Sequence, residues 1–169
     1  MKKITTLAAA LILTTFGSSF AASYVSPDDN LTGVTLCIDN NSFQAKIGGL
    51  TTISSKVAQT SYDYFVAQAT AKKIPFKEMG DKSCVDWAIN LDFGATVGTP
   101  RAWYGDIWVS DDGAYASLNA KDLYRKPVTV WEDSSFGVLP DNDGITAYLI
   151  DQGKGLVDSL LDAYVKVNK

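Results

Sequence analysis

The sequence predicts an α+β fold: a single sheet, mostly antiparallel or mixed, with two amphipathic helices packed on one of its faces. Residues 84–93 alternate between large apolar and mainly polar side chains, which is typical of a half-buried strand. Further strand patterns follow up to residue 131, and segments of helical periodicity lie at residues 50–73 and 145–167. Two helices with one apolar stripe each can bury the apolar face of such a sheet.

The first 21 residues predict a cleaved signal peptide. Lysines occupy positions 2 and 3, residues 7–13 are apolar without a break, and Ser19 and Ala21 are the small residues that a signal peptidase needs before a cut at Ala22. A spanning helix needs about 20 mostly apolar residues, so we expect no stable membrane insertion after cleavage. These features predict a bacterial periplasmic or secreted protein. Residues 22–32 would form a flexible leader, and residues 33–169 a single α+β domain.

Charge and histidine content exclude several function classes. Cleavage removes two of the 15 basic residues and none of the 19 acidic ones, which leaves a net charge of −6. The basic residues form no patch that could neutralise phosphates, so we expect no nucleic acid partner. The chain has no histidine, which excludes Ser-His-Asp and Cys-His catalysis and histidine-ligated metals. The acidic turns at 111–113 and 141–144 lack the register of a calcium loop, so we expect no metal site and no cofactor.

The chain has two cysteines, Cys37 and Cys84. In an oxidising compartment an even pair usually forms a disulfide. We therefore expect a Cys37–Cys84 disulfide, with two separate buried thiols as the alternative. A catalytic redox pair is not expected, because the sequence contains no C-x-x-C motif.

The amino-terminal half of the domain predicts a strand, a long helix and a short second strand. Residues 31–39 alternate, with Val34, Leu36 and Ile38 on one face and Cys37 on the other. The helix follows the glycine pair at 48–49 and ends before Pro75, because the residue before a proline avoids the α region. Residues 75–79 predict the short strand. The expected apolar stripe of the helix consists of Leu50, Ile53, Val57, Tyr62, Phe65, Val66 and Ala69.

The middle of the chain predicts further strands joined by turns. A strand at 101–109, a hairpin turn at 110–113, a return strand at 114–120 and a strand at 127–131 follow the strand at 84–93. Residues 134–144 predict a long loop. The stretch 132–143 holds Phe136, Val138 and Leu139, apolar side chains that must be buried or bind something.

The last segment, residues 145–167, has the spacing of an amphipathic helix. Gly153 and Gly155 are unfavourable inside it, each costing up to about 1 kcal/mol relative to alanine. Either the helix packs tightly at these glycines, or it begins after them and residues 145–150 form another strand. We favour the continuous helix.

Three residues of the strand at 101–109 are candidate binding residues. Tyr104, Asp106 and Trp108 share one face at period two, with a possible bulge at Gly105. Exposed aromatic rings beside a carboxylate would suit stacking on a sugar or contact with a peptide. The alternative is that these rings, together with Trp103, belong to the core under a helix.

A cluster of carboxylates is a second candidate site. Asp86, Asn90 and Asp92 share the polar face of the strand at 84–93, and Asp106 lies on a neighbouring strand. Paired carboxylates can hydrolyse glycosides, one as acid and the other as base or nucleophile. A solvated outer sheet face explains the same pattern, and we favour that interpretation because alternation alone predicts it.

The order of elements resembles small exported α/β domains. The first strand, the long helix ending in Lys73-Ile74-Pro75, the strands and the closing helix are similar to the amino-terminal domain of TolB and to the periplasmic domains of curli-secretion-type lipoproteins. Residues 128–132 and 156–168 also resemble short uncharacterised periplasmic proteins of Gram-negative bacteria. The chain departs from the curli-type lipoproteins in having no cysteine directly after the predicted cut. The resemblance implies a periplasmic α/β fold, and fold likeness by itself does not assign a function.

These observations predict an exported, non-enzymatic domain that binds an envelope protein or another envelope component such as a glycan. One alternative is a small carboxylate-based glycan hydrolase that uses Asp86, Asp92 or Asp106. Another is a structural or stress-related envelope protein without a small ligand.

Overall fold

The computed structural model of the protein describes residues 27–79, 84, 87–111 and 128–169. The predicted signal peptide, residues 22–26 of the predicted leader and the return strand at 114–120 lie outside these ranges. Within them, no helix has both the length and the apolar character that a membrane crossing requires.

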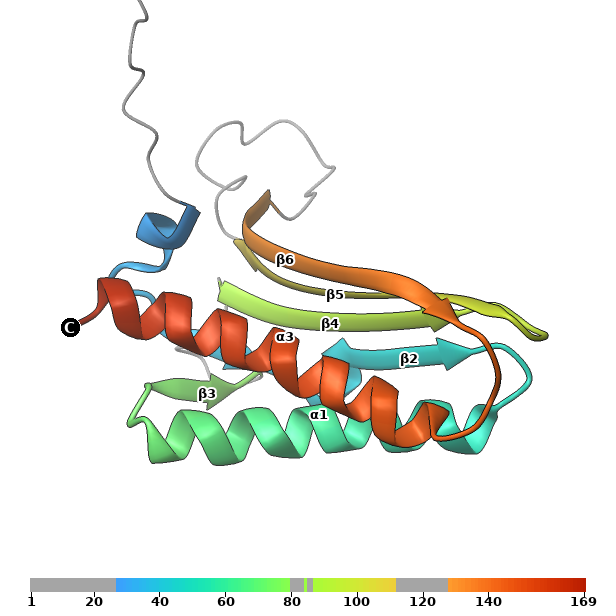
Figure 1. The fold of residues 1–169 in the computed structure, drawn as a ribbon. Helices are drawn as coiled ribbons and strands as arrows, with labels where there is room; N and C mark the ends of the chain where they lie inside the picture. The colour runs from blue at the N-terminus through green and yellow to red at the C-terminus, as the bar shows by residue number, and fades with distance from the viewer. Residues whose placement is uncertain (1–26, 80–83, 85–86, 112–127) are drawn as a thin grey trace, which may run out of the picture.

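Six strands form one mixed sheet (Figure 1). Its order is β3-β1-β4-β5-β6, and β2 also pairs with β4. The ladders between β4, β5 and β6 are long and antiparallel, whereas β1 and β2 run parallel to β4. The predicted α+β fold with a mostly antiparallel or mixed sheet is therefore confirmed. The strands are β1 Leu36–Ile38, β2 Phe43–Ile47, β3 Phe76–Glu78, β4 Trp87–Ala95, β5 Arg101–Asp111 and β6 Val128–Leu139.

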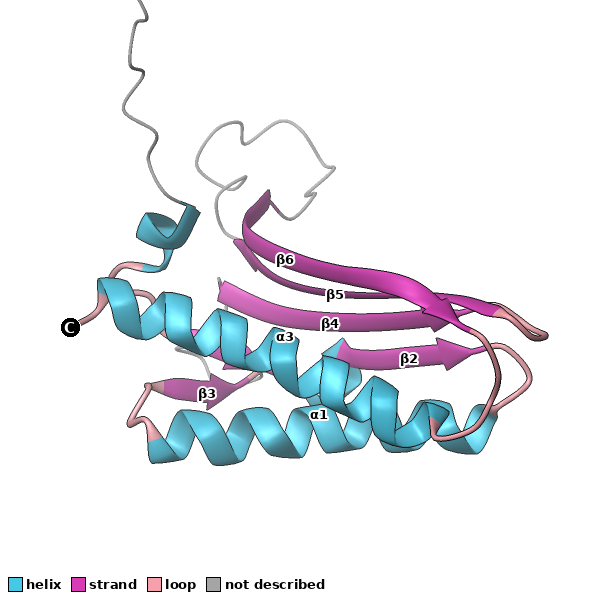
Figure 2. Ribbon diagram, in the orientation of Figure 1, coloured by secondary structure: helices cyan, strands magenta, loops and turns pink. Residues whose placement is uncertain are grey.

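Two long helices, α1 Thr51–Ala71 and α3 Ile145–Val167, cover the same face of this sheet (Figure 2). They lie against each other, and the Tyr64 hydroxyl of α1 donates a hydrogen bond to the Asp158 carboxylate of α3 at 3.0 Å. The core fills the space between the helices and the sheet. Its fully buried members include Val57, Phe65, Ile89, Leu91, Phe93, Ile107, Val109, Leu149, Leu160 and Leu161.

The buried stripe of α1 differs from the predicted one by including two small polar residues. Ser54 and Ser61 are buried, whereas Leu50 and Ile53 are only partly buried. The Ser61 hydroxyl donates to the Val57 carbonyl at 2.9 Å, so its burial leaves no unsatisfied donor. Small side chains at these positions allow close packing, which apolar periodicity alone does not indicate.

The predicted strand at 31–39 is shorter than expected, since only Leu36–Ile38 is a strand. Pro27–Leu31 forms a 3-10 helix, η1, and the Leu31 side chain is fully buried. The Asn30 side chain donates to the Val130 carbonyl at 2.8 Å, and the Asn168 side chain donates to the Leu31 carbonyl at 2.9 Å. These contacts join η1 to β6 and to the end of α3, and the flexible leader at residues 22–32 stays a prediction.

Strand β2 was not predicted from the sequence. Phe43 and Ile47 are buried on the helix side, and β2 pairs with β4 from Phe43↔Leu91 to Ile47↔Ala95. The five residues of β2 carry too short an alternation to distinguish a strand from a loop.

The predicted loop at 134–144 and the predicted turn at 110–113 are both partly wrong. Strand β6 continues to Leu139. The sequence did not indicate this strand, because the inward positions Asp133, Ser135 and Gly137 lack the apolar character by which a buried strand face is recognised. Ser110 and Asp111 still belong to β5 and pair with both neighbouring strands.

The bulge expected at Gly105 is absent. Gly105 pairs in regular register with Phe93 of β4 and Ser135 of β6, and the register shift lies between Val109 and Ser110. A Cβ on Gly105 would lie 2.3 Å from the Phe93 ring, so the glycine gives this core ring its space.

Tyr164 of α3 provides a test of how the helix is fixed to the amino-terminal segment. Its hydroxyl donates to the Val34 carbonyl at 2.7 Å, and burial raises the pKa of this phenol above its usual value of about 10. The neutral form is therefore favoured in the folded state, and the associated stability is present below pH 10 and lost as the pH rises further. Chemical denaturation at stepped pH should show Tyr164→Phe about 1 kcal/mol less stable than wild type at pH 8. That difference should shrink above pH 10, and a constant difference up to pH 11.5 would contradict this role.

Candidate binding surface

The sheet face opposite the two helices is covered by none of the described helices or strands, and we call it the open face (Figure 1). Alternation along each strand places one set of side chains on it. The set includes Gln44 and Lys46 from β2, Asn90, Asp92 and Gly94 from β4, Ala102, Tyr104, Asp106 and Trp108 from β5, and Glu132, Ser134, Phe136 and Val138 from β6.

The three candidate residues of β5 lie together on the open face. Tyr104 is 44% exposed, and Asp106 and Trp108 are half-buried. Trp103 points the other way and is buried between Phe93 and Tyr148, with ring centroids 6.5 and 5.5 Å away. Core packing is therefore the correct interpretation for Trp103 and not for Tyr104.

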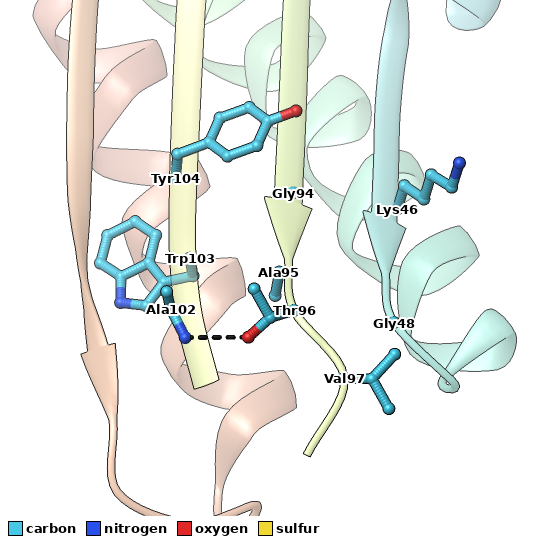
Figure 3. Close-up of a pocket in the computed structure, with 9 residues that line it drawn as sticks. All are labelled: Lys46, Gly48, Gly94, Ala95, Thr96, Val97, Ala102, Trp103 and Tyr104. Atoms are coloured by element: carbon cyan, nitrogen blue, oxygen red, sulfur yellow. Dashed lines mark hydrogen bonds between the residues drawn. The ribbon is translucent and has the colours of Figure 1, made fainter. Parts of the chain in front are cut away.

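The Tyr104 ring extends from β5 over β4, and Lys46 lies beyond β4 on β2 (Figure 3). It covers Gly94, where an added Cβ would lie 2.1 Å from a ring carbon. Its hydroxyl donates to the Asp92 carboxylate at 3.0 Å. That hydrogen bond, followed by burial and the charges of Asp92 and Asp106, raises the pKa of Tyr104. The ring is thus held over the backbone, with its exposed side available for stacking.

A shallow pocket of about 490 Å³ opens beside Tyr104 at the end of β2 and β4. Its walls are mainly apolar or backbone, and they are formed by Lys46, Gly48, Gly94, Ala95, Thr96, Val97, Ala102, Trp103 and Tyr104 (Figure 3). The buried Arg101 guanidinium donates to the carbonyls of Gly48 and Thr96, at 2.7 Å for Gly48, and to the Asn142 side chain. Arg101 therefore ties together the loops around the pocket, a role that no sequence signal indicated.

Two strongly exposed apolar side chains of β6 continue this surface. Phe136 is 83% exposed and Val138 is 67% exposed, and they pair across the strands with Tyr104 and Ala102. We call Ala102, Tyr104, Phe136 and Val138 the apolar strip. The sequence had indicated that Phe136, Val138 and Leu139 must be buried or bind something; Leu139 is buried, and the other two join the strip.

The other end of the open face is acidic. Asp92 and Asp106 are direct cross-strand partners, and Glu132 pairs with Trp108. Asp86, the remaining residue of the predicted carboxylate cluster, lies outside the described residues. Among the described residues, no three His, Cys, Asp or Glu side chains are placed to hold a metal ion.

The Asp92–Asp106 pair should destabilise the fold, since like charges directly opposite each other in antiparallel strands repel. We expect Asp106→Asn to raise the free energy of unfolding by about 0.2–1 kcal/mol in urea denaturation at low salt. Asp133→Asn is the matched control, because Asp133 faces Ile107 and not a carboxylate. Equal effects of both substitutions would show that the gain comes from net charge and not from this pair.

Cys37 and Cys84 form the predicted disulfide, with their Cα atoms 5.4 Å apart. Both cysteines are buried, and the alternative of two separate thiols is wrong. Cys37 lies in the middle of β1, so the bond fixes Cys84 to the centre of this short strand.

A scan against protein-family models finds no match, and a search of curated proteins finds no significant relative. The resemblance to periplasmic α/β domains therefore stays a prediction.

Proposed function

We propose that the protein is an exported, non-enzymatic domain that binds an envelope protein through its open face. The observation that supports this most strongly is the apolar strip, which exposes Phe136 and Val138 on a face that the described helices leave uncovered. Contiguous exposed apolar side chains on a folded domain are typical of interaction surfaces. The Cys37–Cys84 disulfide supports a periplasmic or secreted location, where such bonds persist.

The chemistry of the strip favours a protein partner over a glycan. Phe136, Val138 and Ala102 offer no hydrogen bonds, whereas a glycan presents hydroxyl groups that need them. Tyr104 beside Asp92 suits either partner, because the ring can stack and the carboxylate can accept hydrogen bonds.

Photo-crosslinking inside cells tests this proposal. A photoreactive residue replaces Tyr104 or Phe136 on the open face, and Lys56 or Gln59 on the exposed side of α1 in matched controls. We expect one reproducible crosslinked protein from both open-face positions and none from the controls. The same products from all four positions, or only crosslinks between copies of the chain, would contradict a dedicated binding face.

The cross-strand pair of Asp92 and Asp106 favours one second candidate function, glycan hydrolysis. Directly opposed side chains on neighbouring strands have Cβ atoms about 5 Å apart, which is close to the spacing of carboxylates in retaining glycosidases. If this function is correct, Asp92→Asn and Asp106→Asn each abolish release of reducing ends from peptidoglycan while the variants stay folded. Absence of any release by the wild-type protein would contradict it.

A further inference from the structure

The outer edge of β6 has no strand partner among the described residues, although β6 runs over 12 residues. At its start, the Val130 carbonyl accepts a hydrogen bond from the Asn30 side chain of η1, which covers that end of the edge. From Glu132 to Val138, no described element lies along the edge.

The orientation of the outward-facing backbone groups follows from Ser134. Its N–H donates to the adjacent Asp133 carboxylate at 2.8 Å, so it points away from β5. In an antiparallel strand, the N–H and C=O of one residue point to the same side, and the side alternates at each residue. The backbone groups of Glu132, Phe136 and Val138 therefore point outward as well. The side chains of these same residues lie on the open face.

Such an edge is a template for one more strand, because its outward donors and acceptors lack a described strand partner and match those of an extended polypeptide. The open-face side chains along it change from acidic to apolar. Glu132 stands at one end, with Asp106 behind Ser134, and Phe136 and Val138 stand at the other. The described cations of the open face, Lys46 of β2 and Lys77 of β3, both lie on the far side of β4 and β5 from this edge.

We propose that β6 binds an extended segment of another protein by strand addition, with apolar side chains over Phe136 and Val138 and a basic side chain beside Glu132. A second copy of this chain fits less well, because it would bring further negative charge to an acidic edge. This inference rests on the proposed function and specifies how the partner would bind.

The probe is a capped heptapeptide designed to pair antiparallel with residues 132–138. It carries valine, isoleucine, threonine and lysine opposite Val138, Phe136, Ser134 and Glu132, with threonine at the positions between them. We expect saturable binding to the folded protein, and slowed hydrogen exchange of the Ser134, Phe136 and Val138 amides, measured by NMR. Replacing the lysine by glutamate should weaken binding about two- to fivefold at low salt.

Two controls separate backbone pairing from simple apolar contact. A peptide with two N-methyl groups on the amides that face β6 keeps its side chains, and it should bind at least about tenfold more weakly. Ser134→Pro removes one edge N–H where proline is tolerated, and Ser134→Ala is its matched control. Only the proline variant should lose peptide binding, and the N-methylated peptide keeps the test valid if that variant does not fold.

The proposal is overturned if the N-methylated and unmethylated peptides bind with equal affinity, or if the unmethylated peptide shows no saturable binding at millimolar concentration. It is also overturned if the peptide protects amides other than those of Ser134, Phe136 and Val138. If the protection of these three amides rose with protein concentration in the absence of peptide, a second copy of the chain would occupy the edge. That result would also overturn the proposal. Crosslinks from positions 104 and 136 without amide protection would leave the proposed function intact while refuting strand addition.

Discussion

Replacing Cys37 and Cys84 together by alanine lowers the free energy of unfolding by about 4 kcal/mol. The bond closes a loop with a sequence separation of 47 residues, and the chain-entropy relation gives this magnitude for a loop of that length. Local structure would not compensate, because β1 has only three residues and relies on its pairing with β3 and β4. Alanine suits both positions, since both cysteines are buried and a hydroxyl there would need a partner.

Urea denaturation of the oxidised protein, the reduced protein and the double-alanine variant measures this effect. The reduced protein and the variant should have similar midpoints, both well below that of the oxidised protein. If the free energies of unfolding of the oxidised protein and the double-alanine variant differed by less than about 1 kcal/mol, the disulfide would not hold the amino-terminal part of the sheet together.

Gly153→Ala should destabilise the protein by about 1–2 kcal/mol, whereas Gly155→Ala should stabilise it by about 0.5–1 kcal/mol. Both glycines lie inside α3, so alanine improves helix propensity at both. A Cβ on Gly153 would lie 2.4 Å from the Ser61 hydroxyl oxygen and 3.3 Å from the Phe93 ring, while a Cβ on Gly155 meets nothing within 4 Å. At Gly153, where α3 touches α1 and the sheet, the clash costs more than the gain in helix propensity. At Gly155 only the gain in helix propensity remains.

Thermal unfolding of the two variants tests this difference, and a third variant tests its cause. Adding Ser61→Ala to Gly153→Ala removes the clashing oxygen and should recover most of the lost stability, because the remaining Ser61 Cβ lies at an acceptable 3.5 Å. Equal effects of the two single substitutions would contradict close packing of the helices at this position.

The long elements could be predicted because their periodicity is local. The 3.6-residue pattern of α3 favoured one helix through Gly153 and Gly155, and the structure shows that helix. The alternation in β4 likewise placed Ile89, Leu91 and Phe93 on the buried face. The position of Gly153 against Ser61 could not be predicted, since it depends on how two helices far apart in sequence are aligned.

The candidate surface could be predicted only in part. Period two placed Tyr104, Asp106 and Trp108 on one face, and the structure confirms that placement. Phe136 was expected in a loop, because the inward positions of β6 are not apolar and its pairing with β5 is set by long-range register. The alternation of Phe136 and Val138 about Gly137 was the available signal for this strand, but two residues are too few to identify one.

Replacing Phe136 and Val138 together by threonine separates binding from folding on the open face. Both side chains are mostly exposed, and threonine suits a strand, so the free energy of unfolding should stay within about 0.5 kcal/mol of wild type. Crosslinking from position 104 in the same variant should be lost. A binding role for this face would be contradicted if crosslinking were unchanged while the free energy of unfolding fell by about 2 kcal/mol or more. A fall of that size is roughly what the loss of a buried apolar pair would cost.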